Sequence, residues 1–216
     1  MSKLRLKFSK EDQAVWLSHL DLLRTFQRVF IRSGMVLRHS QGFHPHPLLN
    51  LALPLPVGQS SGCEILDFET TGDEAPEAMV QRLNPAMPAG IRALDCWEPV
   101  RPVGELALLE AAVTFEYDRA LPPDWGEALL AALGREQLVV QKRTKRKALA
   151  DVDLKPMLAA ARLEGDTLLV RVQAQNPGLN PALLAQAVGT LAPELAPDFV
   201  RVRRLALLDG DGKEFR

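Results

Sequence analysis

All four histidines of the chain lie between residues 19 and 46, and an imidazole can serve as a general base, a metal ligand or a hydrogen-bond donor. His44 and His46 are two residues apart in a proline-flanked segment, so in an extended chain they would point to the same side. With His39 as a third donor they could ligate zinc. No carboxylate or cysteine stands at a recognised ligand spacing beside them, and the prolines alone account for a rigid loop. We therefore expect no bound metal and no cofactor.

His19 is a second candidate for acid–base chemistry. It precedes Leu23 by four residues and Phe26 by seven, which places it on the apolar side of an expected helix. One interpretation is a partly buried histidine that is hydrogen-bonded near the helix start. The other is a general base, because a helix N-terminus would keep an imidazole neutral. His19 and His46 are thus the candidate catalytic residues, although the sequence does not show that the chain catalyses a reaction.

The strongest charge feature is the segment KRTKRK at residues 142–147. Its positive charges come from five residues, Lys142, Arg143, Lys145, Arg146 and Lys147. Without them, 21 basic residues face 27 acidic ones, so the rest of the chain carries a net charge of −6. A basic segment on an acidic protein predicts an anionic partner such as RNA, although a solvated loop has the same composition.

Further candidates for RNA contacts lie on the expected first helix and in the loop SQGFHPHP that follows it. Three arginines recur every four residues and share one helix face, namely Arg24, Arg28 and Arg32. This face is either simply solvated or able to contact phosphates. In and just after this loop, Gln41, His44 and Asn50 are donors suited to phosphate and sugar contacts. Phe43 would either stack on an unpaired base or fill a hydrophobic gap that anchors the loop.

Hydrophobic periodicity predicts the elements that must position these residues. Residues 3–8 alternate as a half-buried strand does. A helix is expected from Ser18, its N-cap, to Ser33, with Gly34 ending it. The following segments indicate two extended pieces, a strand, a helix and a strand, at residues 35–39, 48–53, 63–70, 76–83 and 91–97.

The second half repeats this order of elements. It predicts a strand, a helix, a short strand, a hairpin turning at Gly165 and Asp166, a helix and a last strand, at residues 107–117, 124–134, 138–141, 157–174, 180–191 and 199–208. The simplest account is an α+β protein of two tandem ferredoxin-like (split β-α-β) domains. Pro102 and Gly104 interrupt the periodicity. We expect an N-terminal domain with the histidine-rich loop at 1–101 and a C-terminal domain with the basic loop at 105–216.

Composition narrows the class of protein. Hydrophobic residues make up 47% and charged residues 25%, as in ordinary globular proteins. The sequence has no run of about 18 apolar residues and no signal peptide, so we expect a cytoplasmic protein without membrane contact. Cys63 and Cys96 form no CxxC pair and are expected to be reduced, buried thiols. The chain also lacks a P-loop, a GxGxxG motif and a GxSxG elbow.

The strings WLSHLDLLRTFQRVFIRSG (16–34) and SQGFHPHPLLNLALPLPVG (40–58) closely resemble the radical-SAM-linked protein family. The family's common helix start and its glycine-Phe-x-Pro-His-Pro loop are matched by Ser18, His19, Leu20 and Asp21 and by Gly42, Phe43, Pro45, His46 and Pro47. The segment DVDLKPML (151–158) also fits. Members of that family are uncharacterised and are fused to, or encoded beside, a radical SAM protein. The resemblance therefore implies a radical SAM partner and no established reaction.

A more distant likeness is to the RAMP superfamily of CRISPR RNA-processing endonucleases. It implies tandem ferredoxin-like domains and a histidine near the first helix, but the glycine-rich loop of those proteins is missing here. We expect an RNA-binding module that acts with a radical SAM partner in modification or processing of RNA or a ribosomal component. The alternatives are a metal-independent ribonuclease with a histidine general base, and a protein–protein adaptor that presents a substrate to the radical SAM enzyme.

Overall fold

The computed structural model describes residues 2–143 and 149–216, and of Arg143 it describes the backbone alone. Helices and antiparallel sheets alternate along the chain, so the predicted α+β class is confirmed. The chain forms two compact units, which are described separately below. The first consists of Met1–Glu105 together with Glu214–Arg216, and the second of Leu106–Lys213.

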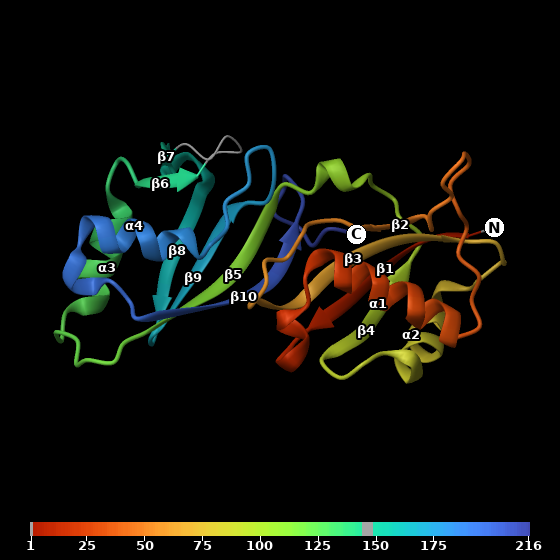
Figure 1. The fold of residues 1–216 in the computed structure, drawn as a ribbon. Coiled ribbons are helices and arrows are strands. Elements are labelled where there is room, and N and C mark those ends of the chain that lie inside the picture. The colour runs from red at the N-terminus through yellow and green to blue at the C-terminus, as the bar shows by residue number, and fades with distance from the viewer. Residues whose placement is uncertain (1, 144–148) are drawn as a thin grey trace. The chain divides into compact units, whose positions relative to one another are not determined.

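The first unit is a four-stranded antiparallel sheet with two helices (Figure 1). Its elements are β1 (Ser2–Lys10), α1 (His19–Arg32), β2 (Leu49–Leu51), β3 (Ser60–Thr70), α2 (Pro76–Leu83) and β4 (Ile91–Trp97). The strand order is β4-β1-β3-β2, and every neighbouring pair is antiparallel. This is the order of a split β-α-β arrangement, in which β3 lies between the two strands that α1 connects.

Alternation along β1 and the capping of α1 build the core of the first unit. Leu4, Leu6 and Phe8 are buried on the sheet face that the helices cover. The side chain of Ser18 accepts a hydrogen bond from the Asp21 amide, which satisfies one of the free donors at the start of α1. The predicted first helix is therefore confirmed, and its Phe26 ring meets the Phe8 ring edge-on at 4.8 Å.

The opposite face of this sheet carries a buried ion pair. Arg5 stands directly across from Asp67 in the register of β1 and β3. Its Nε and Nη2 atoms donate to the two Asp67 carboxylate oxygens at 2.6 and 2.8 Å. Only 1% of Arg5 is exposed, because the ring of Phe215 covers its guanidinium at 4.9 Å from the ring centroid. The two central strands are thus joined by side chains as well as by backbone hydrogen bonds.

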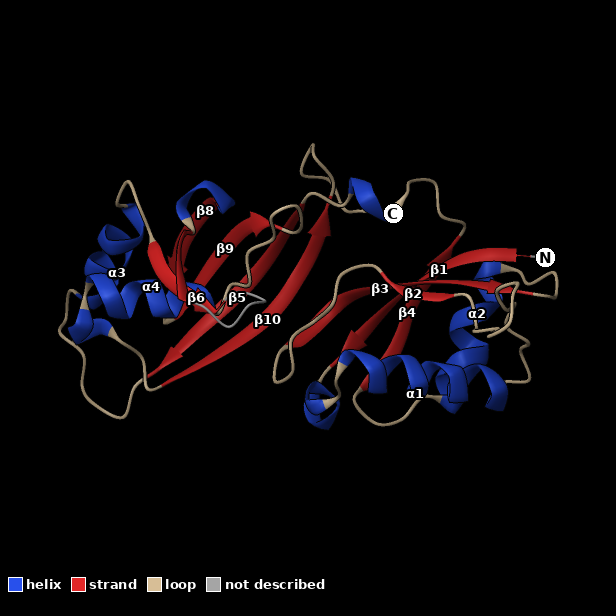
Figure 2. Cartoon of the chain, turned by 45° about the horizontal axis from the view of Figure 1, so that its top comes forward, coloured by secondary structure: helices blue, strands red, loops and turns tan. Residues whose placement is uncertain are grey.

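The second unit has the same strand order with an added hairpin. Its elements are β5 (Leu108–Glu116), α3 (Trp125–Gly134), β6 (Val139–Arg143), β7 (Leu149–Asp153), β8 (Leu158–Glu164), β9 (Thr167–Gln173), α4 (Leu183–Leu191) and β10 (Phe199–Leu208). The main sheet has the order β10-β5-β9-β8, while β6 and β7 form a separate two-stranded sheet. In both units the helices lie on one face of the main sheet (Figure 2).

Several local expectations need correction. The short strand expected at 138–141 is confirmed as β6, but β7, with which it pairs in the described part of the chain, was not predicted. Two aspartates in LADVD hide its alternation, because aspartate is depleted in strands. The extended piece 35–39 makes only isolated bridges at Leu37 and His39, since its pairing ends as the chain turns away into a loop. The last helix begins at Leu183 rather than near residue 180.

One aspartate of β7 closes the added hairpin. The Asp153 carboxylate accepts hydrogen bonds from the backbone amides of Leu138 at 2.8 Å and Lys155 at 3.0 Å. These bonds, the one from Leu138 first, hold the pKa of Asp153 below its ordinary value. The base of the hairpin is therefore held by a charge-assisted contact as well as by the β6–β7 ladder.

The buried pair makes a testable prediction about stability. Replacing Asp67 by alanine leaves the Arg5 guanidinium buried without its carboxylate, which costs about 3–5 kcal/mol of unfolding free energy. Glu69 lies two residues away on the same strand face and pairs with the more exposed Arg38, so Glu69→Ala is a matched control costing about 1 kcal/mol or less. Urea unfolding followed by circular dichroism measures both changes. Equal losses for the two variants would contradict this account of the pair.

Candidate functional site

A hairpin-shaped loop, residues 38–48, carries most of the candidate residues of the first unit. The Leu48 amide donates to the Arg38 carbonyl at 2.8 Å, and the Ser40 amide donates to the His46 carbonyl at 2.9 Å. Its foot is fixed to β3, because backbone hydrogen bonds link Glu69 to Arg38 and to Leu48. Loop 38–48 is therefore an ordered extension of the sheet, with residues 41–45 at its tip.

The tip of loop 38–48 presents its side chains to solvent. Gln41, Phe43 and His44 are all exposed, and Phe43 is 102% exposed. Gly42 between them has a φ of +129°, a backbone conformation that side-chain-bearing residues rarely adopt. The interpretation of Phe43 as a plug that anchors the loop is therefore wrong, because its ring contacts no core. A free aromatic face at this position can stack on another flat group.

His46 is oriented by a neighbouring hydroxyl. Its Nδ1 lies 2.8 Å from the Ser40 Oγ, which also accepts a hydrogen bond from the His46 backbone amide at 3.2 Å. Among the described residues the Nε2 atom of His46 has no hydrogen-bond partner. If Nδ1 donates its proton to Ser40, Nε2 is a free acceptor, as a general base requires.

A hollow of about 420 Å³ opens beside the foot of loop 38–48. It is lined by His46, Pro47, Leu48, Leu49 and Asn50 and by Lys3, Asp67, Phe68 and Glu69 of the neighbouring strands. Its two carboxylates are already paired, Asp67 with Arg5 and Glu69 with Arg38. Neither the Lys3 ammonium nor the Asn50 amide has a partner within the described ranges. The hollow therefore offers free donors and a local excess of positive charge, which suits an anionic or carbonyl-rich ligand.

The three arginines of α1 are exposed on one face but are not equally available. Arg24 pairs with Asp21 at 3.3 Å, and Arg32 donates to the backbone carbonyl of Ala86. Hydrogen bonds from Ser18 first, and from Arg24, hold the pKa of Asp21 below its ordinary value. Arg28 has no ion-pair or hydrogen-bond partner in the described part of the chain. One of the three guanidiniums is thus free to bind an anion without breaking an existing contact.

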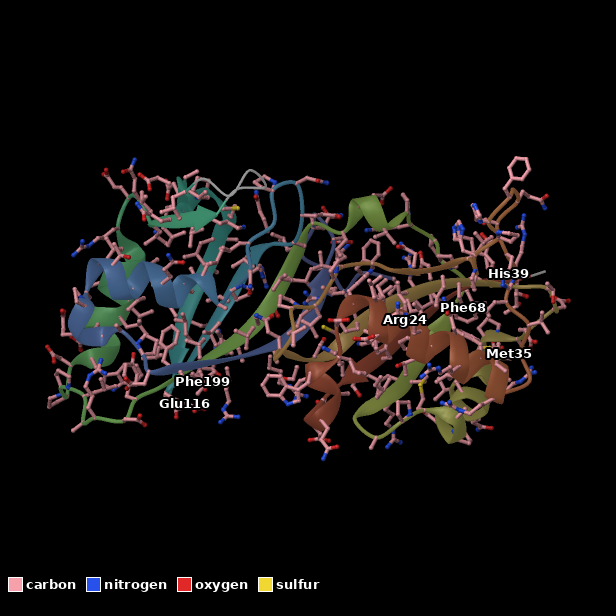
Figure 3. The ribbon with its side chains drawn as sticks, viewed as in Figure 1. Arg24, Met35, His39, Phe68, Glu116 and Phe199 are labelled. Carbon is pink, nitrogen blue, oxygen red and sulfur yellow. The ribbon has the colours of Figure 1, made fainter. Side chains whose placement is uncertain are left out.

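The two candidate catalytic histidines are not brought together. His19 starts α1, on the sheet face where Leu66 is buried. His46 lines the hollow together with Asp67. Asp67 follows Leu66 in β3, so its side chain points to the opposite face of the sheet from Leu66. Figure 3 labels Arg24 on α1 and His39 at the foot of loop 38–48, in separate parts of the unit.

The surroundings of His19 differ from the expected ones. It is partly buried as expected, but its Nδ1 is buried without a hydrogen-bond partner in the described structure. The described residues contain no group of three or more His, Cys, Asp or Glu placed to hold a metal.

The basic run begins on β6, in the added hairpin of the second unit. Lys142 is exposed on β6, and Arg143 is the last residue of that strand. Lys145, Arg146 and Lys147 lie outside the described residues, between β6 and β7 in the sequence. The pairing of β6 with β7 is what the sequence did not reveal, although VVQ before the run indicated its first strand.

Sequence reasoning named Asn50 as a donor but missed Lys3 as a donor of the hollow. The only signal was alternation, which places Lys3 on the face opposite Leu4. The two cysteines are buried free thiols, as expected. Burial, and then the charge of Asp95, raise the pKa of Cys96 to about 12. No described helix has the length and apolar character needed to cross a bilayer.

Comparison with known proteins gives a family and distant structural likenesses. No curated protein matches the sequence. Among solved structures, a chain of "Crystal Structure of a Cbf5-Nop10-Gar1 Complex" is 10% identical, with a TM-score of 0.49, over 98% of this chain and 50% of that chain. This chain therefore spans half the length of that relative. "Crystal Structure of an Unknown Protein from Galdieria sulphuraria" is 13% identical, with a TM-score of 0.27, over 94% and 98% of the two chains.

A family match covers most of the sequence, from residue 3 to residue 181. The family is described as "Uncharacterized protein conserved in bacteria (DUF2344)". The matched range includes the whole of the first helix, loop 38–48 and the basic run. The chain belongs to this bacterial family.

Proposed function

We propose that the chain is an RNA-binding module whose first unit contacts an unpaired nucleotide through loop 38–48. The observation that carries this proposal is the fully exposed ring of Phe43 at the tip of an ordered loop. A phenylalanine ring in water gains nothing for folding, because it buries no apolar surface. An unpaired base offers it a flat partner, and such stacking is the usual way in which proteins hold single-stranded RNA.

The polar groups around Phe43 suit the rest of a nucleotide. Gln41 and His44 flank the ring at the tip, where sugar and phosphate oxygens would lie beside a stacked base. The hollow at the foot adds the free donors of Lys3 and Asn50 and the Nε2 of His46. Donors without internal partners lose no existing hydrogen bond when they bind a phosphate. This combination of a ring and uncommitted donors favours RNA over an apolar protein partner.

The basic run supplies a second, non-specific contact in the proposal. Its five charges would bind phosphates by counterion release, which is independent of base sequence. The run and the first helix belong to different units, so their convergence on one RNA strand is part of the proposal. The radical SAM partner is also part of the proposal, and it is supported by the resemblance of residues 16–34 and 40–58. In this scheme the chain holds RNA, and the partner carries the reaction.

Substitutions of Phe43 separate RNA stacking from simple apolar contact. Phe43→Leu removes the flat ring but keeps the apolar character, and it should weaken binding of a labelled single-stranded oligonucleotide about fivefold to a hundredfold, the effect of one lost base stack. Phe43→Tyr keeps the ring and should bind as the wild type does. Fluorescence anisotropy measures both affinities. Loss of a bound protein with Phe43→Ala, while RNA affinity is unchanged, would favour the adaptor function instead.

The salt dependence of binding tests the basic run. Alanine at all five basic positions of 142–147 should make the slope of log affinity against log salt shallower by up to about 3.5, if every charge meets a phosphate of a single strand. The comparison is titration at several salt concentrations, with Arg162→Ala and Arg171→Ala as controls, because both arginines already pair with glutamates. If the slope and the affinity are unchanged after all five basic residues are replaced by alanine, this part of the proposal is refuted.

A second candidate function, a metal-independent ribonuclease, is favoured by one observation, the Ser40-oriented ring of His46 with its free Nε2. If His46 is a general base, His46→Ala should slow cleavage of labelled RNA in the presence of EDTA by about 10²–10⁴-fold. His39→Ala, an exposed histidine at the foot of the same loop, is the matched control and should leave the rate unchanged. Cleavage at wild-type rate by His46→Ala would remove His46 as a catalyst and leave binding alone.

A further inference from the structure

The sheet face of the first unit that the helices leave open is crossed by Glu214–Arg216. Phe215 is buried, with 1% of it exposed, and its ring covers the Arg5 guanidinium at 4.9 Å from the centroid. Glu214 forms an ion pair with Lys7, two residues further along β1. Arg216 pairs with Asp95 of β4 and lies over the ring of Trp97 at 4.9 Å. Each of the three residues therefore contacts a different charged or aromatic group of the sheet.

The covered surface has the composition of a nucleotide-binding surface. Arg5 and Lys7 supply two cations on one strand face, and Trp97 supplies a large aromatic ring on the neighbouring strand. Arg5 and Trp97 stand directly opposite each other in the register of β1 and β4. A guanidinium and an indole ring both stack on flat groups, and an ammonium beside them binds an anion.

Two hydrogen-bond donors under Glu214–Arg216 are unsatisfied. The Nη1 of Arg5 and the Nε1 of Trp97 are buried and have no partner among the described residues. A buried donor without an acceptor is unfavourable, and in a folded protein it calls for an explanation such as a ligand. The Phe215 ring covers this place but carries no oxygen or nitrogen. The segment thus fills the space above the sheet while leaving its donors unused.

We propose that this face is a second binding site, for one nucleotide of single-stranded RNA, and that Glu214–Arg216 occupies it as an internal substitute. The Phe215 ring stands in the space where the base would lie against Arg5, and the Glu214 carboxylate stands where the phosphate would meet Lys7. A pyrimidine such as uracil is flat and carries carbonyl oxygens at its edge, so it would satisfy the Arg5 and Trp97 donors. The ring of a phenylalanine such as Phe215 carries no acceptor at its edge, whereas a base carries acceptors on the ring itself, which favours a nucleotide in this place. The inference rests on the proposed RNA-binding function and adds a second site to it.

Binding at this face requires Glu214–Arg216 to leave. The measured affinity is then the affinity of the open site multiplied by the fraction of molecules in which the segment is displaced. Changes in the segment that weaken its contacts raise that fraction without touching the site itself. The segment can therefore be tested apart from the residues that bind.

The experiment measures affinity for a labelled oligo(U) strand in the full chain by anisotropy. Phe215→Ala removes the ring over Arg5 and should tighten binding about tenfold or more, because the open fraction rises. Glu214→Gln breaks the Lys7 pair without adding a positive charge, leaves the Phe215 ring in the chain and should also tighten binding. Phe199→Ala removes a ring that also contacts an arginine but is exposed; it is the control and should give no tightening. Lys7→Glu added to Phe215→Ala should reverse the gain.

Each outcome separates this inference from the proposed function. If neither segment variant tightens oligo(U) binding, while circular dichroism shows folded protein, the second site is refuted. Weakening by Phe43→Leu in the same assay would show that the proposed function survives that failure. If the wild type and every variant fail to bind oligo(U), both proposals fall. A gain for a peptide with acidic and aromatic residues, without any gain for oligo(U), would overturn the RNA site and identify a peptide site.

Discussion

The burial of a single charged pair, Arg5 with Asp67, constrains the whole first unit. A guanidinium that is 1% exposed must keep its carboxylate, because an unpaired charge in that position is strongly unfavourable. The pair can form only in the observed register of β1 and β3, since a shift by one residue would turn the two side chains to opposite faces. Register in turn decides that Leu4, Leu6 and Phe8 face the helices. Core and open face are therefore specified together.

Within the first unit, the hollow, loop 38–48 and the open sheet face are fixed relative to this pair. Asp67 itself lines the hollow, and Glu69, two residues along β3, holds the foot of loop 38–48 through Arg38. Arg5, the partner of Asp67 on β1, contacts the ring of Phe215. Loop 38–48 and Glu214–Arg216 therefore depend on one strand pair for their positions. The carboxylates of Asp67 and Glu69 on this strand pair are already engaged in ion pairs. The free groups of the face are therefore mainly cationic or neutral.

The parts of the fold that follow local rules could be predicted from the sequence. The Ser18 cap, the apolar spacing up to Phe30 and the alternation of residues 3–8 each carry their own signal, and the structure agrees with them. Strand β7 carries no such signal, because its aspartates interrupt the pattern. The contact of Phe215 with Arg5 joins residues from opposite ends of the sequence, and no local pattern reports such a pairing.

The sequence predicted which residues belong to the candidate site better than it predicted their geometry. Residues 41–46 stood out by residue type, but whether Phe43 is buried or exposed depends on what surrounds the loop, which the sequence does not contain. The free state of Arg28, against the engaged states of Arg24 and Arg32, likewise depends on neighbours such as Asp21 and Ala86. Lys3 entered the hollow only through the pairing of β1 with β3.

The added hairpin of the second unit has an evolutionary consequence. The main sheet of the second unit is built from β10, β5, β9 and β8, and in the described residues neither β6 nor β7 pairs with any of these strands. The residues between β6 and β7 in the sequence, which include most of the basic run, can therefore change in length and charge while the ladder of the main sheet is untouched. Natural selection can therefore tune the electrostatic attraction of the residues between β6 and β7 with little effect on the strand pairing of the main sheet.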